Sequence, residues 1–288
     1  MKKMTGLMAI ALALALTFTA CGWFENDDDS KSGWKWTAIA NSTFGDSGIT
    51  DIVYGDGTFV AIGSSGKMAY SADGENWTAV ARPLGSGYNV NGIAYGNGTF
   101  VAGGNNGRMG YSTDCENWTT LTHPSGDYAI NPIIDIAYGG GRFVATGDFG
   151  RMAYSDDGET WTLVANSTFG VSAINHIVYG NDRFIAWTSG KMVYSTDGEI
   201  WTAVAEGASG NSIAYGNGRF VIVSSGGKIS YSTDGESWTA VWTTEKEKDS
   251  PFYTGWSYNS NIRGIAYGNG RFIAVGDEGK MAYADWGE

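Results

Sequence analysis

The sequence predicts an all-β fold in which one four-stranded unit occurs six times. The tract at residues 51–80 (DIVYGDGTFVAIGSSGKMAYSADGENWTAV) returns along the chain, with 36 to 52 residues between successive Tyr-Gly pairs. Glycine makes up 44 of the 288 residues, and turns follow about every eight to twelve residues, which is typical of sheet proteins. Four short strands in about 40 residues is the size of a propeller blade, so we predict a six-bladed β-propeller with four antiparallel strands per blade. The Tyr-Gly pairs begin at Tyr54, Tyr95, Tyr138, Tyr179, Tyr215 and Tyr267.

Each unit divides into four short runs separated by turn residues. In the first unit the runs are residues 52–54, 59–62, 68–71 and 77–80, and the breaks read GDG, SSG and DGEN. Asn-Gly and Asp-Gly pairs at such breaks favour tight hairpin turns, because their residues reach positive φ at low cost. The unit therefore predicts four antiparallel strands in chain order.

The two ends of the repeat region predict a closed ring. The last unit stops at KMAYADWGE and lacks a fourth strand, whereas an extra strand-like segment, residues 34–40 (WKWTAIA), precedes the first unit. Pairing of this N-terminal strand with the C-terminal blade would complete that blade and remove exposed edges. A solenoid of stacked hairpins is the alternative, but it would leave both segments unexplained. We expect the propeller domain to span residues 34–288.

The N-terminal segment predicts export and lipid anchoring. Residues 1–20 combine a basic start with an apolar run too short to span a membrane comfortably, as in a secretory signal peptide. The sequence FTAC ending at Cys21 resembles a bacterial lipobox, which implies cleavage before Cys21 and its lipidation. Residues 21–33 then form an acidic, flexible tether. The alternative is a plain signal peptide in which Cys21 is incidental.

The residues after Cys21 suggest where the anchor holds the protein. Gly22 rather than Asp follows the cysteine, which by resemblance to enterobacterial lipoproteins implies the outer membrane of the bacterial cell envelope. The acidic triplet at 27–29 is similar to surface-export signals of some other bacteria. We therefore expect a membrane-anchored head domain that is exposed at the surface.

Composition excludes several classes of function. The formal net charge is −12, which argues against a nucleic-acid partner and against docking on anionic lipid. Besides Cys21, Cys115 is the one cysteine, so no disulfide framework is possible. No His and Cys cluster has metal-ligand spacing, and we expect neither a metal nor a cofactor.

A motif close to YSTDGEIWT occurs five times in the repeats. Its carboxylates are spread over five units and cannot converge on one substrate, because a catalytic acid–base pair needs two carboxyl groups within about 5–10 Å. A carboxylate in a tight turn accepts backbone N–H groups, the Gly takes the positive-φ corner, and the Trp can cover the seam between blades. We therefore interpret the motif as a structural fastener. Its residues are Ser71, Asp73, Gly74 and Trp77; Ser112, Asp114 and Trp118; Ser155, Asp157, Gly158 and Trp161; Ser195, Asp197, Gly198 and Trp201; and Ser232, Asp234, Gly235 and Trp238.

These copies resemble the Asp-box (BNR) repeat of sialidases and of many unrelated propellers. The resemblance implies a hairpin between the third and fourth strands, on the rim away from the ligand face. The copies here are one residue shorter than the usual sialidase copy, and Cys115 replaces the Gly in the second unit.

The residues required for sialidase chemistry are missing. There is no Arg-Ile-Pro element, and Arg142, Arg183, Arg219 and Arg271 recur at one repeat position, where we interpret them as solvated strand ends rather than an anion-binding triad. His123 and His176 are the only histidines, and no nucleophile elbow is present. We expect a protein that is not an enzyme.

Ligand binding is expected on the face built by the loops between second and third strands and between successive units. The longest departure from the repeat, residues 244–263, carries four aromatic residues that could bind a partner or glycan, or fold back and bury their own rings. They are Phe252, Tyr253, Trp256 and Tyr258. Shorter loops on this face bring further aromatics, among them Phe44, Phe149 and Phe169.

The residue before each first-strand Ile gives a second candidate site at the mouth of the channel. Asp51, Asp135 and His176 occupy this position in three units and could hold a cation or polar ligand, or merely hydrate the pore.

Together these features predict a lipid-anchored, non-catalytic binding module for a protein or a carbohydrate. One alternative is an envelope assembly factor or scaffold, since similar propellers include a photosynthetic assembly factor. A second alternative is a degenerate, sialidase-like glycosidase.

Overall fold

A computed structural model describes much of the repeat region. The described residues are 43–45, 47–80, 84–85, 87–121, 130, 132–188, 190–205, 207–208, 210–242, 262–268, 271–276 and 281–285. The chain divides into two compact units, Met1–Thr37 and Ala38–Glu288, and all described residues belong to the second. Residues 1–20, Cys21 and the tether at 21–33 therefore lie outside the described part.

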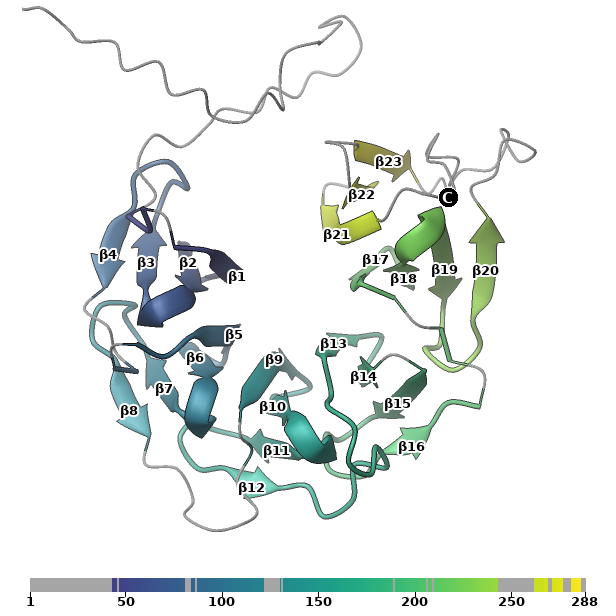
Figure 1. The fold of residues 1–288 in the computed structure, drawn as a ribbon, viewed down its shortest axis with the longest axis horizontal. Helices are drawn as coiled ribbons and strands as arrows, with labels where there is room; N and C mark the ends of the chain where they lie inside the picture. The colour runs from purple at the N-terminus through teal and green to yellow at the C-terminus, as the bar shows by residue number, and fades with distance from the viewer. Residues whose placement is uncertain are drawn as a thin grey trace, which may run out of the picture. The chain divides into compact units, whose positions relative to one another are not determined.

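The described strands form five four-stranded antiparallel sheets and one three-stranded sheet, each with its strands in chain order. This is the predicted all-β propeller architecture (Figure 1). The first three sheets are β1 (Ile49–Gly55), β2 (Thr58–Gly63), β3 (Met68–Ser71) and β4 (Thr78–Val80); β5 (Val90–Gly96), β6 (Thr99–Gly104), β7 (Met109–Ser112) and β8 (Thr119–Leu121); and β9 (Ile133–Gly139), β10 (Arg142–Gly147), β11 (Met152–Ser155) and β12 (Thr162–Leu163). The others are β13 (His176–Gly180), β14 (Arg183–Thr188), β15 (Lys191–Ser195) and β16 (Thr202–Ala203); β17 (Ser212–Gly216), β18 (Arg219–Val223), β19 (Lys228–Ser232) and β20 (Thr239–Trp242); and β21 (Ile262–Gly268), β22 (Arg271–Gly276) and β23 (Met281–Asp285).

Turn chemistry explains the strand register. In the first sheet, Gly55 pairs with Thr58 across a two-residue turn in which Asp56 and Gly57 have φ of 47° and 75°. Two consecutive positive φ values are typical of the type I′ turn, whose twist matches that of the flanking strands. Asn97-Gly98 and Asn217-Gly218 have the same two positive φ values, so the predicted tight turn between the first and second strands is confirmed at these pairs. In the Asp-Gly pairs before the fourth strand, only the Gly has a positive φ. The first strand begins three residues before the predicted start at Ile52.

The second and third strands of four sheets are joined by a single 3₁₀ turn. These turns are η1 (Ser64–Gly66), η2 (Asn105–Gly107), η3 (Asp148–Gly150) and η4 (Ser225–Gly227). The middle residue of each turn is left-handed, with φ between 57° and 72°. This backbone shape is important for the candidate site described below.

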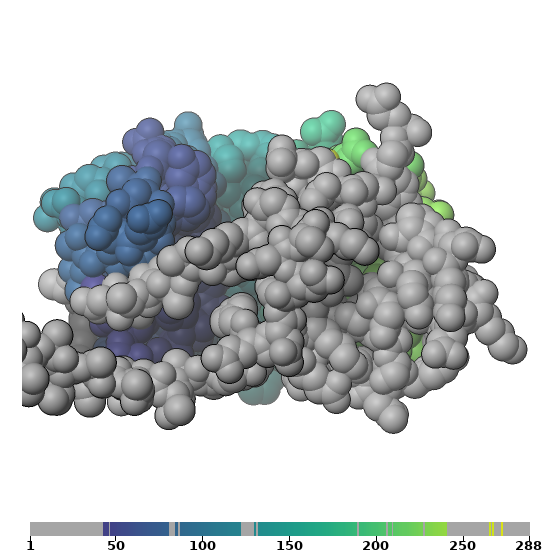
Figure 2. Space-filling view, turned by 90° about the horizontal axis from the view of Figure 1, so that it is seen from above, coloured from purple at the N-terminus to yellow at the C-terminus, as the bar shows by residue number. Residues whose placement is uncertain are grey.

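The hydrophobic cores lie between neighbouring sheets. One cluster joins Val60 and Ile62 of the first sheet to Ile93 and Phe100 of the second. Equivalent clusters join each later pair of neighbours through the fifth and sixth sheets. Successive first strands contact each other, and the first two sheets, purple and blue, lie side by side in both views (Figures 1 and 2).

Stacking of a tyrosine on a glycine explains the Tyr-Gly pair that marks each repeat. The Tyr95 ring lies over Gly55 of the preceding sheet, where a Cβ atom would come within 2.1 Å of the ring. The Tyr rings of the third to sixth sheets cover Gly96, Gly139, Gly180 and Gly216 in the same way. Only glycine leaves room for a ring at this distance. The Gly of one pair and the Tyr of the next pair therefore pack together where two sheets meet.

The sixth sheet has three strands, and the segment predicted to complete it, residues 34–40, lies outside the described residues. Closure of the ring with six complete blades therefore remains a prediction. In the described part of the chain, no helix has the length and apolar character needed to cross a membrane.

Candidate functional site

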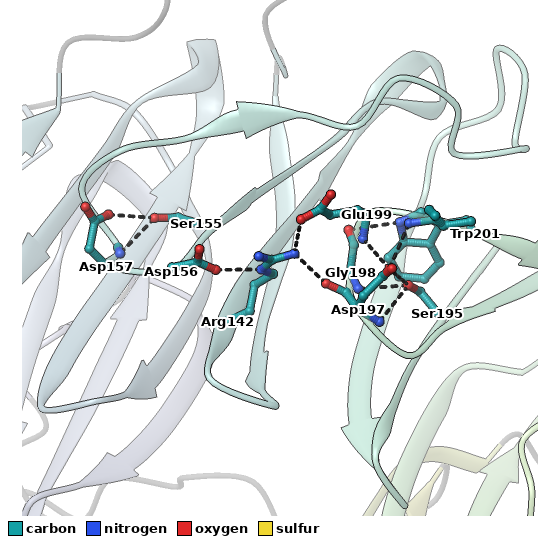
Figure 3. A network of polar contacts seen from close by, with 11 residues as sticks. Arg142, Ser155, Asp156, Asp157, Ser195, Asp197, Gly198, Glu199 and Trp201 are labelled. Carbon is teal, nitrogen blue, oxygen red and sulfur yellow. Dashed lines mark hydrogen bonds and ion pairs between the residues drawn. The ribbon is translucent and has the colours of Figure 1, made fainter.

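The repeated Ser and Asp residues lie in the hairpin between the third and fourth strands. In the fourth sheet, Ser195 Oγ donates to Asp197 Oδ1 (2.9 Å) and accepts a bond from the Gly198 N–H (2.8 Å). The backbone N–H groups two and three residues after Asp197 also donate to Oδ1, both at 2.9 Å. The Trp201 indole N–H donates to the Gly198 carbonyl at 3.1 Å and so closes the turn (Figure 3). We call this arrangement the Ser-Asp turn.

All five Ser-Asp turns in the described residues share the bonds to the Asp Oδ1 and the indole bond, and the four turns that carry Gly also share the bond from the Gly N–H to the Ser Oγ. The two backbone N–H groups lie 2.7–3.0 Å from the Asp Oδ1, and the indole N–H lies 3.0–3.2 Å from the carbonyl of the Gly or Cys residue. The carboxylates are those of Asp73, Asp114, Asp157, Asp197 and Asp234. In the second to fifth sheets, the Trp packs in the core shared with the preceding sheet; these are Trp118, Trp161, Trp201 and Trp238.

The hydrogen bonds keep these carboxylates ionised. The amide side chain three residues further on, together with backbone N–H groups, lowers the pKa of Asp114 to about 2. Burial raises the pKa of Asp234, but its backbone and serine donors outweigh that effect and bring it to about 2. A carboxylate occupied by several donors in its own turn is a poor general acid or nucleophile. The geometry suits a structural acceptor.

Cys115 occupies the glycine position of the turn in the second sheet. Its φ is 66°, and its side chain is buried in the core between the first two sheets. Burial, with the nearby charge of Asp114, raises the pKa of the thiol to about 11. Packing against the core accounts for a non-glycine residue at this corner.

Arg142 at the start of β10 connects two sheets, and the prediction that it is a solvated strand end is wrong. Its side chain is 19% exposed, and its Nε donates to Asp156 of its own sheet at 2.6 Å. Its Nη1 donates to the Asp197 carbonyl (2.7 Å) and to Glu199 (2.5 Å) of the next Ser-Asp turn (Figure 3). Arg183 makes the equivalent ion pair with Glu236 at 2.6 Å. These arginines position one sheet against the next.

A second row of cations precedes the third strands and holds loops. Lys67 Nζ donates to the Phe44 carbonyl at 2.5 Å, and Arg108 donates to the Leu84 carbonyl at 3.2 Å. Lys191 donates to the Thr168 carbonyl. Each bond ties a third strand to the loop that enters its own sheet.

The predicted channel residues also make bonds between sheets. Asp51 accepts the N–H of Ile93 in the next sheet at 3.2 Å, and Asp135 accepts that of Ile177 at 3.0 Å. Asp135 lies 3.9 Å from His176 Nδ1. The carboxylates therefore act as backbone acceptors across sheet seams, which explains why side chains of this type precede the first-strand Ile.

Burial changes the protonation of this group. It raises the pKa of Asp51 to about 6, and together with the Asp51 charge it raises that of Asp135 to about 7. Burial lowers the pKa of His176, whose ring stacks on Trp187 with 4.8 Å between centroids. No group of three acidic, His or Cys side chains that could hold a metal occurs among the described residues. The structure thus gives no support for the cation hypothesis at these three residues.

The aromatic insert predicted as the main ligand site is not described. Residues 244–261 with Phe252, Tyr253, Trp256 and Tyr258 fall outside the described residues. Of the shorter loop aromatics, Phe44 and Phe169 are buried, whereas Phe149 is 63% exposed.

A pocket of about 360 Å³ lies beside Phe149 on the predicted loop face. It is formed by η3 and by the loop that leads from β12 to β13, so it combines both loop sets of the expected ligand face. Phe149, Leu163 and Val164 give it apolar walls, while Arg151 and Asn166 add polar groups.

Phe149 is the one bulky residue at the left-handed middle position of the four 3₁₀ turns. The equivalent residues are Ser65, Asn106 and Gly226, whereas Phe149 has a φ of 57°. A left-handed conformation costs a residue with a Cβ about 1–2 kcal/mol, least for Asn and Asp. An exposed ring recovers little of that cost by burial, and strained residues of this kind cluster at functional sites. Comparing the repeat position across units is the sequence signal that would have identified Phe149.

The comparisons with known proteins support the fold. A family model described as the DUF6242 beta propeller domain matches residues 136–254, less than half of the chain. No curated protein matches.

Solved structures give matches at low identity. The structure described as YCF48 bound to D1 peptide has a TM-score of 0.65 and 16% identity, over 83% of this chain and 78% of that chain. YCF48 from Cyanidioschyzon merolae has a TM-score of 0.62 and 16% identity, over 83% and 82%. Virginiamycin B lyase from Staphylococcus aureus has a TM-score of 0.62 and 14% identity, over 81% and 78%. At these identities the likeness shows the propeller fold alone.

Proposed function

We propose that the protein is a non-catalytic binding module that holds a protein or carbohydrate on the loop face of the propeller. The observation that carries this proposal is Phe149, an exposed ring on a left-handed backbone beside a pocket of about 360 Å³. Folding alone gives no reason for a phenylalanine there, because three equivalent turns carry Ser, Asn or Gly. A rigid scaffold with one irregular loop is a common basis for recognition.

The state of the described carboxylates supports a function without catalysis. Those of the Ser-Asp turns are occupied by donors of their own turn, and Asp51 and Asp135 are occupied by backbone N–H groups of two strands each. A glycosidase needs two carboxyl groups, one ready to give a proton and one to attack or to activate water. The carboxylates named above instead serve as hydrogen-bond acceptors within the propeller itself.

Attachment to the bacterial envelope is the second part of the proposal. The basic and apolar segment at 1–20 and the lipobox-like sequence at Cys21 support lipidation, and the acidic tether at 21–33 would hold the propeller away from the membrane. Outer-membrane placement follows from Gly22 after the cysteine. Metabolic labelling with an alkyne fatty acid tests this part, and an unlabelled wild-type chain would exclude it.

A closed ring of six blades completes the proposed architecture. Residues 36–45 (WTAIANSTFG) match residues 161–170 (WTLVANSTFG) at eight of ten positions, and the latter include the fourth strand β12. The segment at 34–40 therefore reads as the fourth strand of the C-terminal blade. Ile52 and Tyr54 are more than half exposed, whereas Ile93 and Ile136, equivalent to Ile52, are 4% exposed. Packing of this open face on the last sheet would bury it.

The alternative of an assembly factor or scaffold is favoured by one comparison. The first solved structure above is described as bound to a peptide, and its likeness in fold supports the idea that such a scaffold can hold one. The glycosidase alternative has weaker support, because the lyase match shows only that enzymes also use the fold.

Pull-down with the full-length lipoprotein in detergent tests the proposal. The wild type is compared with Phe149→Ser and with a variant lacking residues 245–261. If the loop face binds a partner, at least one variant loses material that the wild type captures. Equal capture by all three proteins would place binding elsewhere, and release of a chromogenic sugar would show catalysis.

A further inference from the structure

The pocket beside Phe149 has a chemical character that narrows its ligand. Its apolar lining residues include Phe149, Leu163 and Val164, and its polar lining residues are Arg151, Asn166 and Ser167. No Asp or Glu is among the lining residues, although the chain has a net charge of −12, and the neighbouring Asp148 does not line the pocket. The pocket therefore presents one cation and no lining anion.

Arg151 can bind a ligand without giving up a structural role. Cations at the same position in the first, second and fourth sheets donate to loop carbonyls. A guanidinium has five N–H donors in a planar fork, which is enough to hold a loop and a carboxylate together. Asn166 already accepts the Thr168 N–H through Oδ1 at 2.9 Å, so its amide NH₂ is the group that can donate to a ligand.

From this geometry we infer that the pocket binds a hexuronate, a pyranose ring that bears a carboxylate, and that Phe149 stacks on the ring while Arg151 pairs with the carboxylate. The inference rests on the proposed binding function and deepens it by choosing the ligand class. A pyranose has an apolar C–H face that fits an aromatic ring, and hydroxyl and carboxylate groups at its rim that fit amide and guanidinium donors.

Size and polarity favour a sugar over an apolar peptide side chain. The volume of about 360 Å³ lies at the lower end of the range for ligand pockets, about 300–1,000 Å³, and suits one or two rings. An apolar side chain offers no acceptor to the Asn166 amide NH₂ or to the guanidinium fork of Arg151, whereas hydroxyl and carboxylate groups do. A hexuronate can contact the apolar lining residues with its ring and the polar lining residues with its hydroxyl and carboxylate groups.

Binding of oligosaccharides to the full-length lipoprotein tests the inference. The probes are galacturonate and glucuronate oligomers, their methyl esters, which keep the ring but lose the charge, and sialosides. We expect the uronates to bind and the esters to bind at least tenfold more weakly, because the carboxylate pair is lost. Sialosides bound more tightly than uronates, or no uronate binding at millimolar concentration, would overturn the inference.

Two variants link binding to the pocket without threatening the fold. Phe149→Ser introduces the residue of the equivalent first-sheet turn, Ser65; uronate affinity should fall at least tenfold while Tm stays equal or rises. Arg151→Lys introduces the residue found in the first, fourth and fifth sheets, and affinity should fall several-fold because the fork is lost. Asn106→Ser, at the same turn position in the second sheet, is the matched control and should change neither value.

The outcomes separate this inference from the proposed function. Unchanged uronate affinity in Phe149→Ser would place the sugar elsewhere and overturn the inference. If no uronate binds but the loop-face variants lose a captured protein, the binding module stands and the hexuronate assignment falls. If neither sugar nor protein depends on the loop face, both fall.

Discussion

Replacing Arg142 with threonine tests the connection between the third and fourth sheets. Threonine occupies the same repeat position at Thr58 and Thr99, so the first two sheets show that the strand accepts it. The change removes the donor to Asp156, to Glu199 and to the Asp197 carbonyl, and a cation that lies 4.4 Å from the Tyr154 ring centroid.

The exposure of each partner determines the expected magnitude. The Asp156 and Glu199 side chains are 68% and 43% exposed, so each ion pair contributes only about 0.5 kcal/mol after solvent screening. The bond to the Asp197 carbonyl adds about 1 kcal/mol, and the contact with the Tyr154 ring about 0.5 kcal/mol. Arg142→Thr should therefore lower the free energy of unfolding by about 2 to 3 kcal/mol.

Urea unfolding of the wild type and variant measures this difference. In a chain of this size Tm should fall by about 3–6 °C. In 1 M salt the ion-pair share shrinks and the carbonyl bond persists, so the difference should fall without vanishing.

A double-mutant cycle identifies the partner. Glu199→Ala combined with Arg142→Thr should show a coupling energy of about 0.5 kcal/mol. Glu159→Ala changes the equivalent turn residue of the third sheet, which follows a sheet that carries Thr99 in place of the arginine, and it serves as the control. A loss below about 0.5 kcal/mol for Arg142→Thr, or zero coupling with Glu199, would refute the reasoning.

Three further predictions concern protonation and the Ser-Asp turn. The free energy of unfolding should fall as pH rises from about 4 to 7, since burial raises the pKa values of Asp51 and Asp135 above the unfolded value of 3.8. Urea unfolding at a series of pH values tests this, and the same pH dependence in a variant with both Asp51→Asn and Asp135→Asn would contradict it. Asp157→Ala removes the carboxylate that accepts hydrogen bonds from one hydroxyl and two backbone N–H groups in an exposed turn. The free energy of unfolding, measured in urea, should fall by about 1–2 kcal/mol, against less than about 0.5 kcal/mol for Glu159→Ala. Iodoacetamide should label Cys115 slowly in the native protein and rapidly in urea, because burial raises the thiol pKa to about 11; fast native labelling would disprove this.

Local patterns predicted the sheets because local chemistry determines them. The Asp-Gly and Asn-Gly pairs between the first and second strands form type I′ turns, and these turns determine which strands pair. The Ser-Asp turn is equally local, since the hydrogen bonds to the Asp197 carboxylate come from within three residues of it. Such features can be read from a short stretch of sequence.

Contacts between sheets could not be read in the same way. Arg142 was predicted to be solvated because arginines recur at this repeat position, and the repeat gives no sign that Glu199, 57 residues away, lies beside it. The role of Asp51 as acceptor for the Ile93 N–H likewise depends on how two first strands lie against each other. Phe149 is visible in the sequence, but the strain that makes it unusual depends on its φ.

The position of the hydrophobic cores between sheets has a consequence for how such a chain can evolve. A sheet taken alone would expose apolar surface to water on both faces. Each sheet is therefore stabilised by packing against its neighbours, as in repeat proteins generally. Because each of the five seams between successive described sheets reuses a tyrosine on a glycine, an inserted or deleted whole unit finds a compatible surface on each side. Duplication of complete units therefore preserves the packing, while loss of part of a unit exposes it.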